Sequence, residues 1–462
     1  MSEEQPTLSE MLPHRTVIKG VIITVIAAIL SIALYHILPY DDNANKGIGL
    51  LLFIAILWFT EAVHITVTAL MIPILGVAIG IPELSTQKAL STFANPIIFL
   101  FFGGFALATA LHIQQLDKKI AFWLISLSGS HLGIATLSMF GVTAFLSMWI
   151  SNTATAAMML PLALGMMQHL DKTKDRNTFV FILLGIAYSA SIGGLGTIVG
   201  SPPNAIASAA LDLDFTGWME YGLPMMLVLL PVMLLSMFLV LRPRLNQKIT
   251  VTTESIPWTL PRVITLVIFL ATAVAWIFGS YIGKKFGISS PDTWVAIAAA
   301  IAVILFGSAT WKQVSDGTDW GVLLLFGGGL TLSALLKDSG ASLVLGQQVA
   351  NTFGTSHPLL VIVIVTIFII ALTEFTSNTA SAALLVPVFA SIAAQMGMPK
   401  EVLVLVIGIG ASCAFMLPVA TPPNAIVFGS GLIKQKEMIK AGLVLNAFCI
   451  VVISLWAYFF LL

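Results

Sequence analysis

Long uncharged apolar runs recur along the whole of this chain. Clear examples occupy residues 17–38, 225–241, 263–278, 294–306, 359–372 and 443–462. About 20 apolar residues in an α-helix suffice to cross a bilayer, and uncharged flanks lengthen the shorter runs. Only 9% of the residues are charged, whereas a soluble domain carries roughly 25%. A β-barrel would show short alternating segments, which are absent. The pattern predicts an all-α polytopic membrane protein embedded in the lipid bilayer.

Charge and cysteine content exclude other classes of protein. The formal net charge is zero, so nothing points to nucleic acid as a partner. Cys413 and Cys449 both lie in apolar sequence without metal-ligand spacing, and we interpret them as small core residues. The first 15 residues are polar and acidic, unlike a secretory signal. We therefore expect a retained first span after a cytoplasmic N-terminal segment.

The basic residues predict the orientation in the membrane. With the N-terminus placed inside, 15 of the 21 Lys and Arg residues fall on the cytoplasmic side, as the positive-inside rule requires. This assignment works only if the apolar segments around residues 151 and 377 enter the membrane and return on the same side. We therefore expect two re-entrant helical hairpins, eleven transmembrane helices and a C-terminus outside.

Three motifs occur twice, in the same order. SNTATAAMMLP at 151 matches SNTASAALLVP at 377, FLFFGGFALATAL matches LLLFGGGLTLSAL, and SPPN at 201 matches TPPN at 421. The offsets are 226 for Ser151 and Ser377, 224 for Gly103 and Gly327, and 220 for Asn204 and Asn424. An odd number of predicted spans separates equivalent points. The halves are therefore expected to be inverted-topology repeats, which place a substrate site at their interface.

The doubled prolines must break a helix inside the membrane. They remove two amide donors and bar helical conformation just before them, which frees the carbonyls of Val199, Gly200, Val419 and Ala420. Such carbonyls suit a small cation. The helices that restart after each PPN and each SNT direct their positive ends to the same place, which favours an anion. We expect sodium beside an anionic substrate held by Asn152, Thr153, Ser201, Pro202, Asn378, Thr379, Thr421 and Pro422.

Plainer interpretations apply to several of these features. A single SNT is often just a helix N-cap, and the duplication with a PPN break argues against that alone. Glu374 is expected either to pair locally and hold the second hairpin tip or to act directly in transport. Glu61 and His64 suggest a turn between short spans, with His64 structural. The FGG motifs are expected to let helices approach closely.

The run ASCAFMLPVATPPNAIV at 411–427, with the doubled SNT and PPN motifs, resembles the signature of the divalent anion:sodium symporter family. The resemblance implies a scaffold domain and a transport domain that moves as an elevator, in a homodimer. It also implies Na⁺ as coupling ion and amphipathic arms near residues 112–122 and 337–351. One sodium site would comprise Ser147, Ser151, Asn152 and Gly200, and the other Thr373, Thr376, Asn378 and Ala420.

The same resemblance suggests a division of the chain. Residues 1–15 would be cytoplasmic, 16–122 and 243–351 would form scaffold helices with their arms, and 123–242 and 352–462 would form the transport domain. The location would be the cell inner (plasma) membrane.

The expected function is a sodium-coupled symporter that imports C4-dicarboxylates such as succinate, fumarate or malate, rather than an enzyme. A dicarboxylate or citrate exchanger and a sodium:sulfate symporter are alternatives within this fold, and an ion channel is an alternative of another class.

Overall fold

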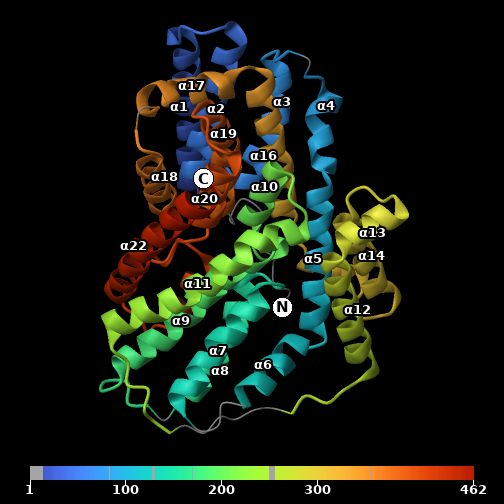
Figure 1. Ribbon diagram of the computed structural model, residues 1–462, viewed down its shortest axis with the longest axis vertical. Helices are drawn as coiled ribbons and strands as arrows, with labels where there is room; N and C mark the ends of the chain where they lie inside the picture. Colours follow the sequence, from blue (N-terminus) through green and yellow to red (C-terminus); the bar gives the residue numbers. More distant parts are fainter. Residues whose placement is uncertain (1–13, 83, 127–130, 169, 249–254, 355) are drawn as a thin grey trace, which may run out of the picture.

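The computed structural model describes residues 14–82, 84–126, 131–168, 170–248, 255–354 and 356–462 (Figure 1). The predicted cytoplasmic segment at 1–15 lies almost wholly outside them. Within these ranges every element is helical, apart from one isolated bridge between His131 and Lys248. The helices of the first half are α1 (His14–Ile37), α2 (Asp42–Thr60), α3 (Ile65–Ala78), α4 (Thr86–Ser91), α5 (Pro96–Ile113), α6 (Leu116–Ser126), α7 (Leu132–Ser147), α8 (Asn152–Met166), α9 (Arg176–Gly193), α10 (Pro202–Leu211) and α11 (Phe215–Leu241). Those of the second half are α12 (Leu260–Ile277), α13 (Gly279–Phe286), α14 (Pro291–Leu305), α15 (Trp311–Gly317), α16 (Trp320–Asp338), α17 (Ala341–Phe353), α18 (Pro358–Thr373), α19 (Asn378–Gln395), α20 (Lys400–Gly410), α21 (Pro422–Gly429) and α22 (Gln435–Phe460).

Many of these helices can cross a membrane. In the described ranges, nine are long and apolar enough, or ten if the bent pair α13 and α14 is one span. Three shorter apolar helices are α3, α7 and α18. The prediction of an all-α polytopic membrane protein is confirmed, while the count of eleven full spans stays a prediction.

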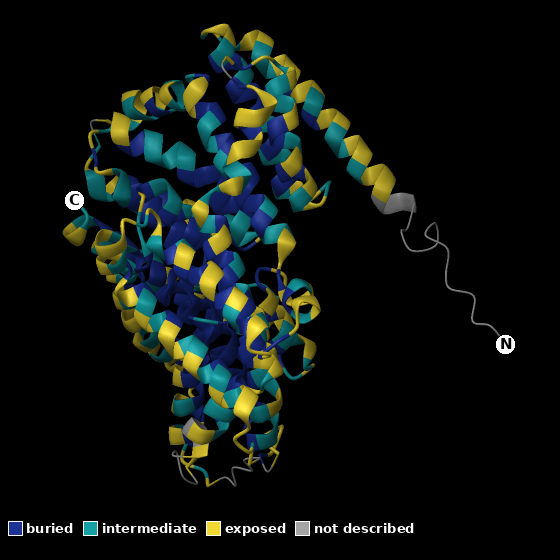
Figure 2. Cartoon of the chain, turned by 90° about the vertical axis from the view of Figure 1, so that its right-hand side faces the viewer, coloured by how far each residue is buried: buried dark blue, intermediate teal, exposed yellow. Residues whose placement is uncertain are grey.

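The burial of the helices separates a core from a periphery. The buried residues of α9 run without a gap from Thr178 to Gly193, whereas only 17% of an 18-residue window of α1 is buried. Val402 to Gly410 of α20 are likewise buried without a gap. Figure 2 shows exposed residues along α1, which extends away from the rest of the molecule. Because α9 and α20 are apolar all round, they suit the interior of a bundle.

The FGG glycines let helices of the two halves cross closely, as predicted. A Cβ on Gly103 in α5 would lie 2.5 Å from the Ala296 carbonyl of α14. The matching contact of α16 joins Gly328 to the Ala69 carbonyl of α3, at 2.6 Å. By these contacts, Gly328 is the structural counterpart of Gly103. The motif comparison had aligned Gly103 with Gly327, one residue earlier. The packing of the helices, rather than the similarity of the two sequences, determines which glycines correspond.

Each half contains a helical pair with SNT at its turn and a helix interrupted at PPN. The pair α7–α8 turns at residues 148–151, and α18–α19 turns at 374–377. In Figure 1 the first pair lies in the lower part of the molecule and the second in the upper part. The interrupted helices are α9 with α10 and α20 with α21, and residues 194–201 and 411–421 form the respective breaks.

Short helices lie where the two arms were expected, with slightly different bounds. The arm expected at 112–122 begins as the end of α5 and continues as α6. The turn between them contains Gln115 at φ 56°. The arm expected at 337–351 is α17, preceded by Gly340 at φ 78°. Glycine adopts this left-handed conformation readily and glutamine does not.

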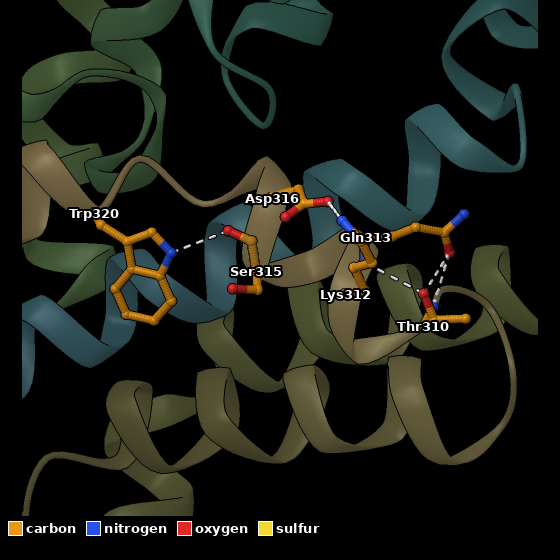
Figure 3. A network of polar contacts seen from close by, with 6 residues as sticks. All are labelled: Thr310, Lys312, Gln313, Ser315, Asp316 and Trp320. Carbon is orange, nitrogen blue, oxygen red and sulfur yellow. Dashed lines mark hydrogen bonds and ion pairs between the residues drawn. The ribbon is translucent and has the colours of Figure 1, made fainter. Parts of the chain in front are cut away.

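The short helix α15 fixes the start of α16. Thr310 and Gln313 form a reciprocal capping box at its N-terminus, which satisfies otherwise unpaired amides. At its other end the Trp320 indole donates to the Ser315 carbonyl at 3.0 Å. Figure 3 shows these contacts together with the Lys312–Asp316 ion pair. They place Asp319, the N-cap of α16, at the wall of the central cavity.

Candidate functional site

A cavity of about 620 Å³ lies where the two hairpins and the two helix breaks meet. All eight residues predicted to bind substrate line it: Asn152, Thr153, Ser201, Pro202, Asn378, Thr379, Thr421 and Pro422. The first residues of α8, α10, α19 and α21 are among them. Four positive helix ends therefore border one cavity, as the motifs predicted.

The cavity wall carries acids and, among its described lining residues, no Lys, Arg or His. Its charged groups are Glu61, at the turn after α2, and Asp319. An anion bound here would be held by helix N-termini and polar side chains, without a basic partner. His64 is the N-cap of α3 and accepts from the Thr66 amide at 3.3 Å, which agrees with a structural role.

Both SNT serines are helix N-caps as well as cavity residues. The Ser151 hydroxyl accepts from the Ala154 amide at 3.2 Å, and the Ser377 hydroxyl accepts from the Ala380 amide at 3.4 Å. The capping interpretation is therefore correct for the serine itself. The residues that follow it, including Asn152 and Thr153, face the cavity.

Three residues of the first predicted sodium site come together. Ser147 has one hydroxyl proton, yet its Oγ lies 2.6 Å from Asn152 Oδ1 and 2.7 Å from the Ala190 carbonyl. The amide atom of Asn152 in this cluster faces only acceptors, which include the Gly200 carbonyl at 3.3 Å. With the amide nitrogen at that place, Asn152 donates to all three oxygens. With the amide oxygen there, the Ser147 hydroxyl is the one side-chain donor among four oxygens, an arrangement that suits a small cation.

The second half repeats this arrangement. Thr373 Oγ1 lies 2.5 Å from Asn378 Oδ1 and 2.8 Å from the Ala411 carbonyl. Thr373 and Asn378 are 226 residues after Ser147 and Asn152, and Ala411 is 221 after Ala190. Ala420, the last residue of the predicted set in this half, lines the same cavity as Asn378. The same contact of a hydroxyl with an asparagine amide and a backbone carbonyl thus occurs once in each half.

Two predicted sodium ligands do not join these clusters through their side chains. Ser151 uses its hydroxyl as the N-cap of α8. Thr376 contacts the Leu372 carbonyl at 2.9 Å and the Ser381 hydroxyl at 2.7 Å, so its side chain is bonded within the hairpin. Neither hydroxyl bonds to the hydroxyl–asparagine–carbonyl cluster of its half.

Ala190 and Ala411 are the cluster members that the sequence reasoning missed. Both contribute a backbone carbonyl near the end of a buried helix, just before the chain breaks. An alanine in an apolar run has no polar side chain that would indicate a binding site. Only the position ahead of the PPN break could have pointed to these carbonyls.

Glu374 holds the second hairpin tip against the second helix break. Its carboxylate accepts from the amides of Phe415, Met416 and Leu417 at 2.7–3.1 Å and from Asn446 Nδ2 at 2.7 Å. The side chain is 2% exposed and is not among the cavity-lining residues. These contacts support local pairing over a direct role in transport.

The comparisons with known proteins identify one family. The model of the sodium:sulfate symporter transmembrane region matches residues 15–462, nearly the whole chain. The chain belongs to this family. Members of the sodium:sulfate symporter family, also described as divalent anion:sodium symporters, are sodium-coupled membrane transporters, and this chain is one of them.

Individual relatives cover most of the chain. An uncharacterized transporter of Haemophilus influenzae is 55% identical over 96% of this chain and 97% of its own length. A sodium-dependent dicarboxylate transporter of Staphylococcus saprophyticus is 33% identical over 95% of this chain and 90% of its own length. Among solved structures, the YdaH transporter of Alcanivorax borkumensis shares the fold with a TM-score of 0.56. It is 12% identical and covers 86% of this chain and 99% of its own.

Proposed function

We propose that this protein is a sodium-coupled symporter that imports C4-dicarboxylates such as succinate, fumarate or malate. The observation that carries the proposal is the duplicated polar cluster, Ser147 with Asn152 and Thr373 with Asn378, on either side of a cavity bordered by four helix N-termini. Two equivalent anion-binding halves suit a substrate with a carboxylate at each end. The relative named for sodium-dependent dicarboxylate transport supports this choice.

The electrostatics explain why sodium is needed. A dianion in a low-dielectric cavity without a basic side chain is unfavourable, and two nearby acids make it more so. Sodium bound in each cluster offsets this charge and orders the hairpin tips. Sodium therefore binds first and substrate second, and coupling requires that the carrier loaded with sodium alone moves poorly.

The proposed transport cycle is an elevator movement. Helices α7–α11 and α18–α22 would form the transport domain, and α1–α6 and α12–α17 the scaffold, with a homodimer formed by the scaffolds. The N-terminus would face the cytoplasm and the C-terminus the outside of the inner (plasma) membrane. The arms α6 and α17 would link the moving and fixed parts.

Uptake of labelled succinate into proteoliposomes tests the proposal. An inward sodium gradient should accelerate accumulation above that in a potassium or choline gradient, and unlabelled fumarate and malate should compete. Uptake that depends on internal dicarboxylate or citrate and ignores sodium would instead identify an exchanger.

Sulfate is the second candidate substrate, because the matching family model is described by sodium:sulfate symport. Competition by sulfate but not by fumarate, with sodium dependence retained, would favour this alternative. Conductive ion flux without accumulation against a gradient would indicate a channel.

A further inference from the structure

Asn204 and Asn424 are fully buried and belong to neither the proposed substrate set nor the proposed sodium sets. Each is the asparagine of a PPN motif and lies in the first turn of the helix that restarts after the break. A buried amide without partners is costly, so its contacts indicate what it does. Both side chains direct their amide nitrogen at the preceding loop.

Each asparagine bonds two carbonyls of its own helix break. Asn204 Nδ2 donates to the carbonyls of Gly194 and Thr197, both at 2.7 Å. Asn424 Nδ2 donates to the carbonyls of Ala414 and Leu417, at 3.1 and 3.0 Å. Donors and acceptors all differ by 220 residues between the halves. The second half thus reproduces the whole three-point contact of the first.

A further pair of carbonyls at the same offset also has side-chain donors, although these donors come from unrelated positions of the first half. The Trp218 indole donates to the Leu195 carbonyl at 2.9 Å, and the Tyr188 hydroxyl donates to the Phe415 carbonyl at 2.7 Å. Side chains thereby satisfy the early carbonyls of both breaks, which have lost their helical partners. The later carbonyl of Gly200 remains directed at Asn152 in the first sodium cluster.

We propose that Asn204 and Asn424 are positioning residues for sodium. By fixing the early carbonyls of the break, each amide sets where the carbonyl of Gly200 or Ala420 lies relative to the hairpin tip. Neither asparagine lines the substrate cavity, so each acts on substrate only through sodium. This inference rests on the proposed sodium coupling.

The two halves differ in the number of other hydrogen bonds between the helix break and the hairpin tip. In the second half, Glu374 binds three consecutive amides of the loop. In the first half, the corresponding link between loop and tip is one bond, from the Thr197 hydroxyl to the Met148 carbonyl at 2.5 Å. Loss of Asn204 should therefore impair sodium binding more than loss of Asn424.

The test compares full-length protein with Asn204→Asp and Asn204→Ala, and with the same changes at Asn424. Asp keeps the side-chain volume but directs an oxygen at the loop carbonyls, while Ala removes the donor. The first measurement is the sodium concentration at which thermal stabilisation is half-maximal, with choline as the replacement ion. The second measurement is the KM for succinate at saturating sodium, which shows whether a variant affects sodium binding without affecting substrate binding.

Both Asn204 variants should raise the sodium midpoint roughly tenfold, because each loses two buried hydrogen bonds. The succinate KM at saturating sodium should stay within about twofold. The Asn424 variants should show smaller shifts. Thr143→Val is the matched control, because its buried hydroxyl donates only within α7, to the Met139 carbonyl at 2.6 Å, and its sodium midpoint should not change.

Several results would overturn the positioning role. One is an unchanged midpoint in both Asn204 variants while the wild type responds to sodium. Another is a shift in Asn204→Asp alone, which would trace to the new charge. A shift of equal size in Thr143→Val would trace to general destabilisation. A wild type without any sodium response would refute the proposed coupling itself, and this inference with it.

Discussion

Asn152 and Asn378 are each proposed to have two roles in one short side chain. Each lines the cavity, and each faces a hydroxyl, that of Ser147 or of Thr373, at 2.6 and 2.5 Å. An amide has an oxygen for a cation and a nitrogen for an anion. The same residue can therefore contact sodium and one carboxylate at once, which links the two binding events without a long-range pathway.

Glu374 gives a prediction about stability. Glu374→Gln should lower the free energy of unfolding by about 2–4 kcal/mol, because an amide nitrogen would replace one acceptor oxygen among several buried donors. Thermal or denaturant unfolding of the purified protein measures this loss. Glu61→Gln is the control, since Glu61 lies at the cavity wall and should change stability by less than about 0.5 kcal/mol. Equal stability of the two variants would contradict the tip-holding role.

The polar side chains of the site could be predicted from sequence, because Ser-Asn-Thr and Pro-Pro-Asn are conspicuous within apolar runs. The carbonyls of Ala190 and Ala411 could not, since any residue type supplies a carbonyl. The orientation of the Thr376 hydroxyl toward Ser381 was also missed. It depends on a partner within the hairpin that spacing alone does not select.

At the scale of elements, α5 and α16 determine how the halves meet. Both cross a helix of the other half at a glycine, Gly103 against α14 and Gly328 against α3. The middle of α5, at residues 101–108, and the start of α16, at Asp319 and Val322, also border the central cavity. The sequence predicted close approach at FGG but paired the glycines one residue out of register. That register depends on three-dimensional packing rather than on the letters of the motif.

Gly103→Ala should therefore destabilise the protein by about 1–3 kcal/mol, because the new methyl group would meet the Ala296 backbone and force the helices apart. Gly141→Ala in α7 is the matched control, since its Cβ would meet nothing within 4 Å. That change should stabilise by up to about 1 kcal/mol through helix propensity. Thermal unfolding compares the two, and a neutral Gly103→Ala would show that the crossing is not tight.

In the whole molecule, the two halves make unequal contacts with α5 and α16. A Cβ on Gly104 would lie 3.1 Å from the Val199 side chain in the first break. The corresponding Gly329 instead faces Ala383 in α19, at 3.0 Å. Val419, the counterpart of Val199, is 83% exposed. If the halves exchange roles in the opposite state, Val419 should pack on Gly329 and Gly104 should face Ala157.

Cysteine accessibility tests this exchange. In the state described here, Val419→Cys should react quickly with a soluble maleimide and Val199→Cys slowly. Conditions that drive the carrier to its opposite state should reverse the order. The native Cys413 and Cys449 are fully buried, so the unsubstituted chain gives the background. Val419→Cys reactivity that never changes with sodium and substrate would contradict an exchange of roles.

We propose that sodium and a dicarboxylate occupy adjacent sites that share Asn152 and Asn378. Equilibrium binding of labelled succinate to the purified protein, in sodium and in choline, tests it most directly. We expect saturable binding in sodium, little binding in choline, and loss of binding in the Asn152→Ala, Asn378→Ala double variant. Equal binding in choline, or undiminished binding by the double variant in sodium, would contradict it.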